Sequence, residues 1–84
     1  MSQDINNALE SIFNSGDPAL QDLANRAMQM KQALEQKEIS ADEYKALIVD
    51  LYHEKNINES VQDLQTKEYI NSTMNALINL ASLY

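Results

Sequence analysis

The sequence predicts an all-α fold in which one domain, residues 1–84, contains four helices. Two of them form a central antiparallel hairpin, and the last is long. Apolar residues recur at three- and four-residue spacing along most of the chain, which is typical of amphipathic helices. One glycine and one proline in 84 residues leave few places to break a helix. Valine and threonine, which favour strands, are scarce.

The first helix is expected over residues 3–14. Its apolar stripe consists of Ile5, Ala8, Leu9, Ile12 and Phe13. Gly16 follows closely and suits the left-handed backbone position that often ends a helix. The sequence therefore predicts a stop between this helix and the next.

The second helix is expected over residues 18–37. Asp17 can cap its free amide groups, and Pro18 fits the first helical position, where no N–H is needed. Its apolar seam consists of Leu20, Leu23, Ala27, Met30 and Leu34. Asp22 and Arg26 have the four-residue spacing of an exposed ion pair.

The third helix has the clearest start signal in the chain. Ser40 and Glu43 have the spacing of a capping box, and Ile39 and Tyr44 occupy the two positions of a hydrophobic staple. The helix is expected over residues 41–54, with an apolar face of Tyr44, Leu47, Ile48 and Leu51. Because only residues 37–40 connect it to the second helix, the two should form an αα-hairpin.

Residues 30–52, MKQALEQKEISADEYKALIVDLY, resemble the short helical hairpin called the SHOCT motif. The matching residues are Ile39, Ser40, Glu43, Tyr44, Ile48 and Leu51. Two features depart from the family pattern: Lys37 stands where a glycine is usual, and the segment lies mid-chain instead of near the end of a longer protein. The resemblance covers about a quarter of the chain and implies an interaction module.

The fourth helix is expected to follow a connection at residues 55–58 and to end near residue 83. Asn58 and Ser60 are both candidate N-caps, and the sequence does not separate them. Val61 and Leu64 are expected to face inward in its first half.

Residues 69–84 contain no charged side chain, and as a helix their apolar residues cover more than half of the circumference. Such a surface must be covered, either by the other helices or by another chain. We expect a partner interface here, formed by Ile70, Asn71, Met74, Asn75, Leu77, Ile78, Ala81 and Tyr84. Asn71, Asn75 and Asn79 repeat every four residues. They form either a strip exposed to solvent or part of a helix–helix contact, in which buried asparagine sets the register of the two helices.

No residue pattern indicates catalysis, a cofactor, a metal or a small-molecule substrate. The chain has no cysteine, and its one histidine, His53, falls opposite the apolar face of its helix. No carboxylate pair is placed on an apolar face, where its pKa would rise. The sequence therefore predicts a protein that is not an enzyme.

Charge and hydropathy limit the class of partner. Thirteen acidic residues against six scattered basic ones give a net charge of −7, which argues against direct binding to nucleic acid. The apolar C-terminal stretch is too short to span a membrane, and no secretory signal is visible. The absence of cysteine fits the cytoplasm.

These observations predict a small acidic protein that self-associates into a homo-oligomer or binds a larger protein partner. It would act as an accessory protein, regulator or inhibitor in bacteria or their phages. The alternative is a structural or assembly subunit, such as a scaffold or chaperone within a viral particle.

Overall fold

A computed structural model describes residues 2–54 and 61–84 of the protein. The elements, in chain order, are α1 (Ser2–Phe13), α2 (Pro18–Glu35), α3 (Ala41–Glu54), α5 (Leu64–Leu80) and a short 3₁₀ helix, η1 (Ala81–Leu83). There is no strand among these described residues, so the predicted all-α fold is confirmed.

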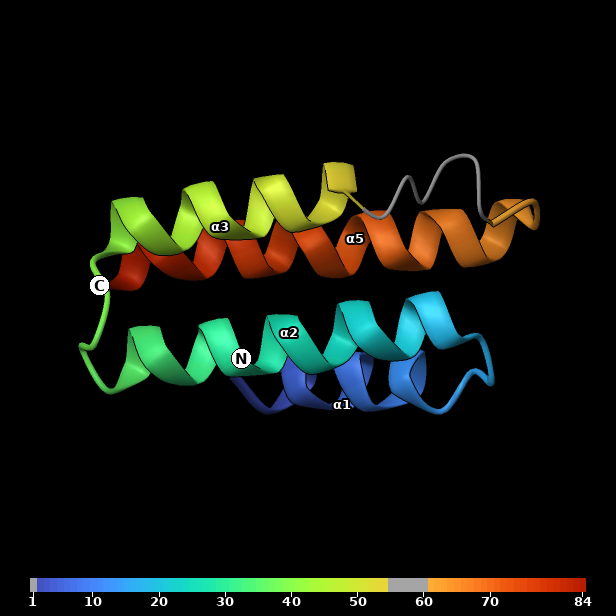
Figure 1. The fold of residues 1–84 in the computed structure, drawn as a ribbon, viewed down its shortest axis with the longest axis horizontal. Coiled ribbons are helices and arrows are strands. Elements are labelled where there is room, and N and C mark those ends of the chain that lie inside the picture. The colour runs from blue at the N-terminus through green and yellow to red at the C-terminus, as the bar shows by residue number, and fades with distance from the viewer. Residues whose placement is uncertain (1, 55–60) are drawn as a thin grey trace.

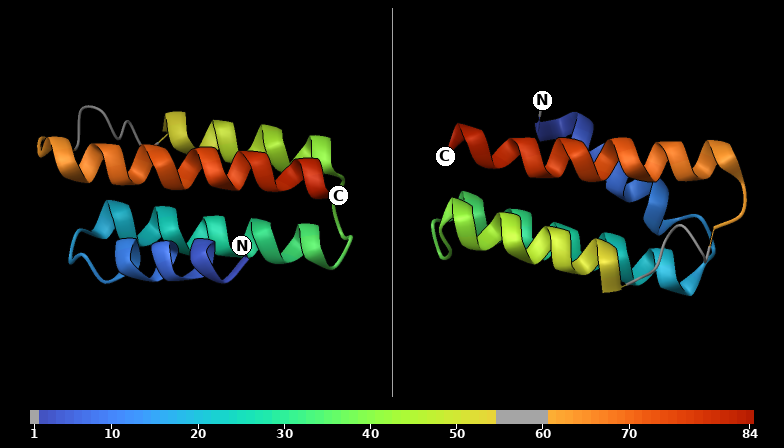
Figure 2. Two further views of the ribbon diagram at one scale, coloured as in Figure 1. Left: turned by 180° about the vertical axis from the view of Figure 1, so that it is seen from behind. Right: turned by 90° about the horizontal axis from the view of Figure 1, so that it is seen from above.

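The helices form an up-down-up-down bundle of two layers, α3 and α5 above α1 and α2 (Figure 1). Each helix packs against two neighbours: α1 against α2 and α5, and α3 against α2 and α5. Seen from above, α1 crosses α5 at an angle (Figure 2). The bundle measures 35 × 23 × 18 Å, with a radius of gyration of 12.0 Å.

The predicted starts of α2 and α3 are confirmed by their side-chain caps. The Ala19 N–H donates to Asp17 Oδ1 at 2.9 Å, and Pro18 occupies the first turn. At α3, the Glu43 N–H donates to Ser40 Oγ and the Ser40 N–H donates to Glu43 Oε1, both at 3.1 Å. These reciprocal bonds satisfy amides that have no partner inside the helix.

The end of α2 lies two residues earlier than predicted, at Glu35. The Glu38 N–H donates to the Ala33 carbonyl at 2.9 Å and the Lys37 N–H donates to the Leu34 carbonyl at 3.0 Å, which is the Schellman pattern. That pattern requires a left-handed residue, and Lys37 has φ 61°. Gly16, after α1, also lies in the left-handed region, at φ 88°, as predicted.

The start of the last helix differs from the prediction. Asn58 and Ser60 lie outside the described residues, and α5 begins at Leu64 with Asp63 as its N-cap. Val61 is buried as expected, but Leu64 is 67% exposed and does not face inward. Leu64 belongs to the first turn of α5, which extends past the end of α3 (Figure 1).

The core consists of Ile5, Leu9, Ile12, Leu20, Leu23, Ala24, Ala27, Leu34, Tyr44, Ile48, Leu51, Val61, Ile70, Met74, Leu77, Leu80 and Ala81. Two residues predicted on apolar faces are instead substantially exposed, Phe13 at 41% and Leu47 at 40%. Both lie at the edge of their helix's apolar stripe, so the neighbouring helices cover them only in part.

The inward face of α2 is also displaced from the predicted seam. Lys31 is buried, whereas Met30 is only half-buried. The Lys31 ammonium group pairs with Glu35 Oε2 at 3.0 Å, so the buried cation has an acidic partner.

The predicted Asp22–Arg26 pair is confirmed at 3.2 Å, and Arg26 also reaches Glu54 of α3 at 3.4 Å.

Candidate protein-binding surface

Half of the predicted interface belongs to the chain's own core. Ile70, Met74, Leu77 and Ala81 are at most 7% exposed. The physical reason is that α1 and α3 both pack against α5 and together cover an apolar face that is too wide for one neighbour. The expectation that these four side chains face a partner is therefore corrected.

The other four predicted interface residues lie on the outer side of α5 or at its end. Asn71 is half-buried, and its side-chain oxygen accepts a hydrogen bond from the Tyr52 hydroxyl of α3. Ile78 is half-buried against the core, while Asn75 and Tyr84 are exposed. Only these four residues keep accessible surface on which the predicted interface can form.

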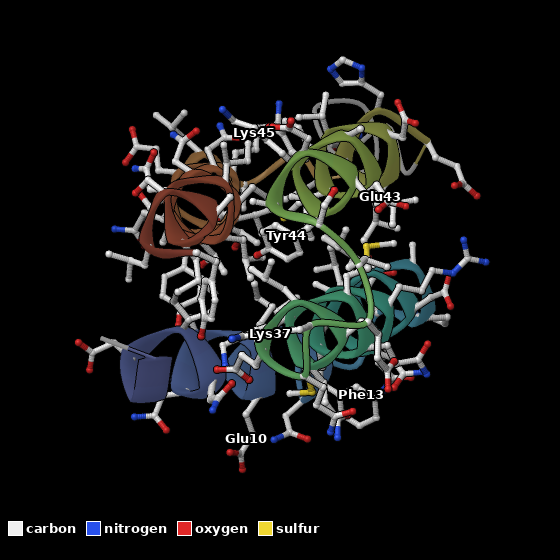
Figure 3. The ribbon with its side chains drawn as sticks, turned by 90° about the vertical axis from the view of Figure 1, so that its left-hand side faces the viewer. Glu10, Phe13, Lys37, Glu43, Tyr44 and Lys45 are labelled. Carbon is white, nitrogen blue, oxygen red and sulfur yellow. The ribbon has the colours of Figure 1, made fainter. Side chains whose placement is uncertain are left out.

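A buried tyrosine shapes the C-terminal end of α5. Tyr44 points inward between α3 and α5, away from Glu43 and Lys45 (Figure 3). Its hydroxyl donates to the Leu77 carbonyl at 2.6 Å. An uninterrupted α-helix would offer that carbonyl to the Ala81 N–H, but this N–H has the Ile78 and Asn79 carbonyls as its partners instead. The last turn therefore tightens into η1.

Large apolar side chains are exposed at and after this tightened turn, at residues 83 and 84. Leu83 is 61% exposed and Tyr84 is 55% exposed, while Ala81 stays buried. Both exposed side chains line an open depression of about 700 Å³, together with Leu34 and Ile39 near the α2–α3 turn. This end of the bundle is one candidate contact surface.

A second candidate surface is a groove between the outer sides of α1 and α5. It consists of three open depressions of about 310, 200 and 430 Å³ that share lining residues from one to the next. We call it the α1–α5 groove, and its walls are Asp4, Ala8, Ser11 and Ser15 on α1's side and Tyr69, Ser72, Ala76, Asn79 and Leu83 on α5's side.

Among the described residues, those that line the α1–α5 groove and carry a charge are acidic. Asp4 lies toward the C-terminal end of α5 and Asp63 at its N-terminal end, and no lysine or arginine of residues 2–54 and 61–84 lines the groove. The Thr66 side chain and the Thr66 N–H both donate to Asp63 Oδ2, at 2.8 and 2.9 Å. These bonds, the side-chain bond first, hold the pKa of Asp63 below its usual range.

The sequence-based prediction missed the groove walls because most of them are small or polar. Ala8, Ser72 and Ala76 contribute little to an apolar pattern. The available signal was spacing, since residues 4, 8, 11 and 15, and residues 69, 72, 76, 79 and 83, each follow one helical line at three- or four-residue steps. That these two lines face each other follows only from the antiparallel packing of α1 and α5.

The remaining candidate sites have ordinary structural roles. His53 is exposed, as its position on the helix predicted, with its ring 6.2 Å from the Tyr52 ring. Within residues 2–54 and 61–84, His, Asp and Glu side chains form no group of three that would hold a metal ion. Nor does any described helix have the length and apolar character needed to cross a membrane.

Comparisons with protein-family models, with curated proteins and with solved structures find no match to this chain. The case for a function therefore depends on the two candidate surfaces and on the charge of the molecule.

Proposed function

We propose that this protein is a small helical interaction module that acts by binding another protein through the surface of α5 and η1. Six large apolar side chains are exposed in the described part of the chain, and four of them lie between residues 64 and 84: Leu64, Tyr69, Leu83 and Tyr84. The adjacent pair Leu83 and Tyr84 carries the proposal, because exposed apolar side chains that lie together mark contact surfaces more often than scattered ones do, whereas Leu64 lies at the opposite end of α5.

The contact end of this surface is formed by Leu83 and Tyr84. Tyrosine and leucine there offer a large apolar area beside an open depression, and tyrosine is enriched among residues that dominate binding energy. The role that follows is an accessory, regulatory or inhibitory one, in which the protein occupies a surface of a larger protein or pairs with a second copy. We place it in a reducing compartment such as the cytoplasm, because the chain has no cysteine.

The proposal is tested by capture from the native host with the tagged protein, comparing wild type with the double variant Leu83→Ser/Tyr84→Ser. The matched control is Leu47→Ser, which removes an exposed apolar side chain from α3. We expect a specific partner that is retained by wild type and by the control but lost by the double variant. Equal capture by all three proteins would contradict the proposal.

Light scattering over a range of concentrations distinguishes self-association, a larger assembly and binding to a different protein. A dimer that the double variant abolishes would identify self-association through this end. A large assembly of uniform mass would instead favour the alternative role as a scaffold or assembly subunit. A monomer at all concentrations would leave a different protein as the partner.

A further inference from the structure

The α1–α5 groove has the dimensions of a helix-binding site. It runs from Asp63, before the first residue of α5, to Leu83, beyond its last. The 17 residues of α5 extend over about 25 Å at 1.5 Å per residue. An incoming helix of four to five turns would therefore contact α5 along its whole length.

The side chains of the groove also favour a helix as the occupant. Its walls are mostly small, with Ala8 facing Ser72 and Ala76 across the middle depression. Small side chains allow a third helix to approach closely and to place a ridge of its own side chains between α1 and α5. Ile5 and Leu80 supply an apolar floor, so the incoming face must be apolar as well.

Charge decides what kind of helix fits. Asp4 and Asp63 lie toward opposite ends of the groove, and its lining in the described part of the chain includes no lysine or arginine. A second copy of this chain would bring the same carboxylates and a further net charge of −7 to the contact. A helix that carries basic residues would instead neutralise both aspartates, and opposite charges across an interface speed and direct association.

We propose that the α1–α5 groove binds an amphipathic helix of another protein, whose apolar face fills the groove and whose lysine or arginine side chains meet Asp4 and Asp63. The proposal rests on the proposed function and names its partner: a cationic amphipathic helix of about 15–18 residues. Leu83 belongs both to this groove and to the exposed end of the chain, so the two surfaces are continuous.

The first test uses two labelled synthetic peptides of about 18 residues, which is five helical turns. One has a leucine face with lysine on the remaining positions, and the other has glutamate in place of every lysine. Fluorescence anisotropy should show that the full-length protein binds the lysine peptide at least about tenfold more tightly, with an affinity that falls as salt rises. Equal binding of the two peptides, or no binding of either, would overturn the proposal.

The second test separates the groove from the general acidity of the protein. Asp4→Asn/Asp63→Asn removes the two groove carboxylates, and asparagine at position 63 keeps the ability to cap α5. The control, Glu10→Gln/Asp50→Asn, removes two exposed carboxylates outside the groove and changes the net charge equally. We expect the first variant to weaken lysine-peptide binding at least about fivefold more than the control, as for charges that meet directly. Equal weakening would overturn the proposal.

The third test blocks the groove sterically. Ser72→Arg places a long cation in the groove wall, whereas Asn75→Arg places the same side chain on exposed α5 surface outside it. Circular dichroism checks that both variants are folded. Loss of peptide binding in Ser72→Arg alone would support the proposal, and equal binding by the two variants would overturn it.

Two experimental outcomes would contradict binding of a cationic helix in the α1–α5 groove without contradicting the proposed role as a protein-binding module. If light scattering shows a dimer that Ser72→Arg abolishes, a second copy occupies the groove and the cationic partner is ruled out. If Leu83→Ser/Tyr84→Ser loses a host partner that Ser72→Arg retains, the proposed function stands while the groove proposal fails.

Discussion

Tyr44 joins α3 to α5 with both its ring and its hydroxyl. The residue is fully buried, and its O–H donates to the Leu77 carbonyl at 2.6 Å. A buried carbonyl without this partner would lose a hydrogen bond that water makes in the unfolded chain. Burial, followed by the nearby Glu35 carboxylate and Tyr84, raises the pKa of the Tyr44 phenol well above its usual range.

Tyr44→Phe should therefore lower the free energy of unfolding by about 1–3 kcal/mol, because the ring remains packed while the Leu77 carbonyl loses its donor. Urea denaturation measures the change. Tyr69→Phe is the matched control, since Tyr69 is 46% exposed and its hydroxyl can meet water. Equal stability of wild type and Tyr44→Phe would contradict the assigned hydrogen bond.

The raised pKa of Tyr44 also predicts a loss of stability in alkali. In the unfolded chain a tyrosine releases its proton near pH 10, whereas the folded chain holds the Tyr44 proton more tightly. This contribution to stability is fully present below about pH 10 and is lost as pH rises further, by at most about 1.4 kcal/mol per pH unit. Urea denaturation at several pH values should show a shallower alkaline fall for Tyr44→Phe. Parallel curves for the two proteins would exclude Tyr44 as the source.

Lys31 shows how one residue shifts the inward face of a helix. The predicted seam included Met30, yet Lys31 is the residue that the structure buries, at 3% exposed. A charged residue is not expected inside from sequence, because its burial costs free energy unless it is paired. Glu35, one turn later, supplies the partner at 3.0 Å.

The α2–α3 turn contains two hydrogen-bonded motifs that stabilise the helix ends and one residue whose backbone is strained. The Schellman bonds and the capping box satisfy the helix ends on both sides of the turn. Lys37 lies between them in the left-handed region, where a residue with a Cβ is strained.

Lys37→Gly should accordingly raise the free energy of unfolding by up to about 1 kcal/mol. Relief of about 1–2 kcal/mol of backbone strain exceeds the extra entropy that glycine loses on folding. Lys37→Ala is the control, because it removes the same charge but keeps a Cβ and should give no gain. If urea midpoints rise equally in both variants, the gain comes from charge and not from the backbone.

At the scale of the whole molecule, α5 closes the bundle by covering both α1 and α3. This position explains why residues 69–84 are so widely apolar. Ile70 and Leu77 fill the core, Tyr69 and Ala76 contribute to the α1–α5 groove, and Leu83 and Tyr84 remain exposed. Residues 69–84, which carry no charged side chain, thus contribute to the core and to both candidate surfaces.

Deletion of residues 73–84 should therefore unfold the protein globally. It removes Met74, Leu77 and Leu80, which are at most 5% exposed. Truncating one such side chain costs about 2–5 kcal/mol, so losing three exceeds the stability of most domains of this size. Far-ultraviolet circular dichroism and thermal melting measure the effect.

The control for this deletion removes residues 83–84 alone. Leu83 and Tyr84 are largely exposed, so this shorter chain should remain folded and melt cooperatively. A folded monomer after deletion of residues 73–84 would show instead that the end of α5 serves only association.

The local features were predictable because they depend on neighbours in the chain. The bounds of α3, the caps at Asp17 and Ser40, and the left-handed Gly16 all depend on interactions within a few residues. The candidate site was only partly predictable. Tyr84 and Asn75 are exposed as an interface requires, but the α1–α5 groove depends on residues about 60 positions apart.

The amino-acid sequence was enough to predict amphipathic helices and the caps at Asp17 and Ser40, because hydrogen bonds and apolar periodicity act over three to five residues. Tertiary packing alone decided which side of α5 is core and which is surface. An apolar face that spans more than half of a helix's circumference could be covered by one neighbouring helix or by two. Only the position of α1, which packs against α5 together with α3, shows that there are two. For that reason Ile70 and Leu77 stabilise the fold, while Leu83 and Tyr84 remain exposed.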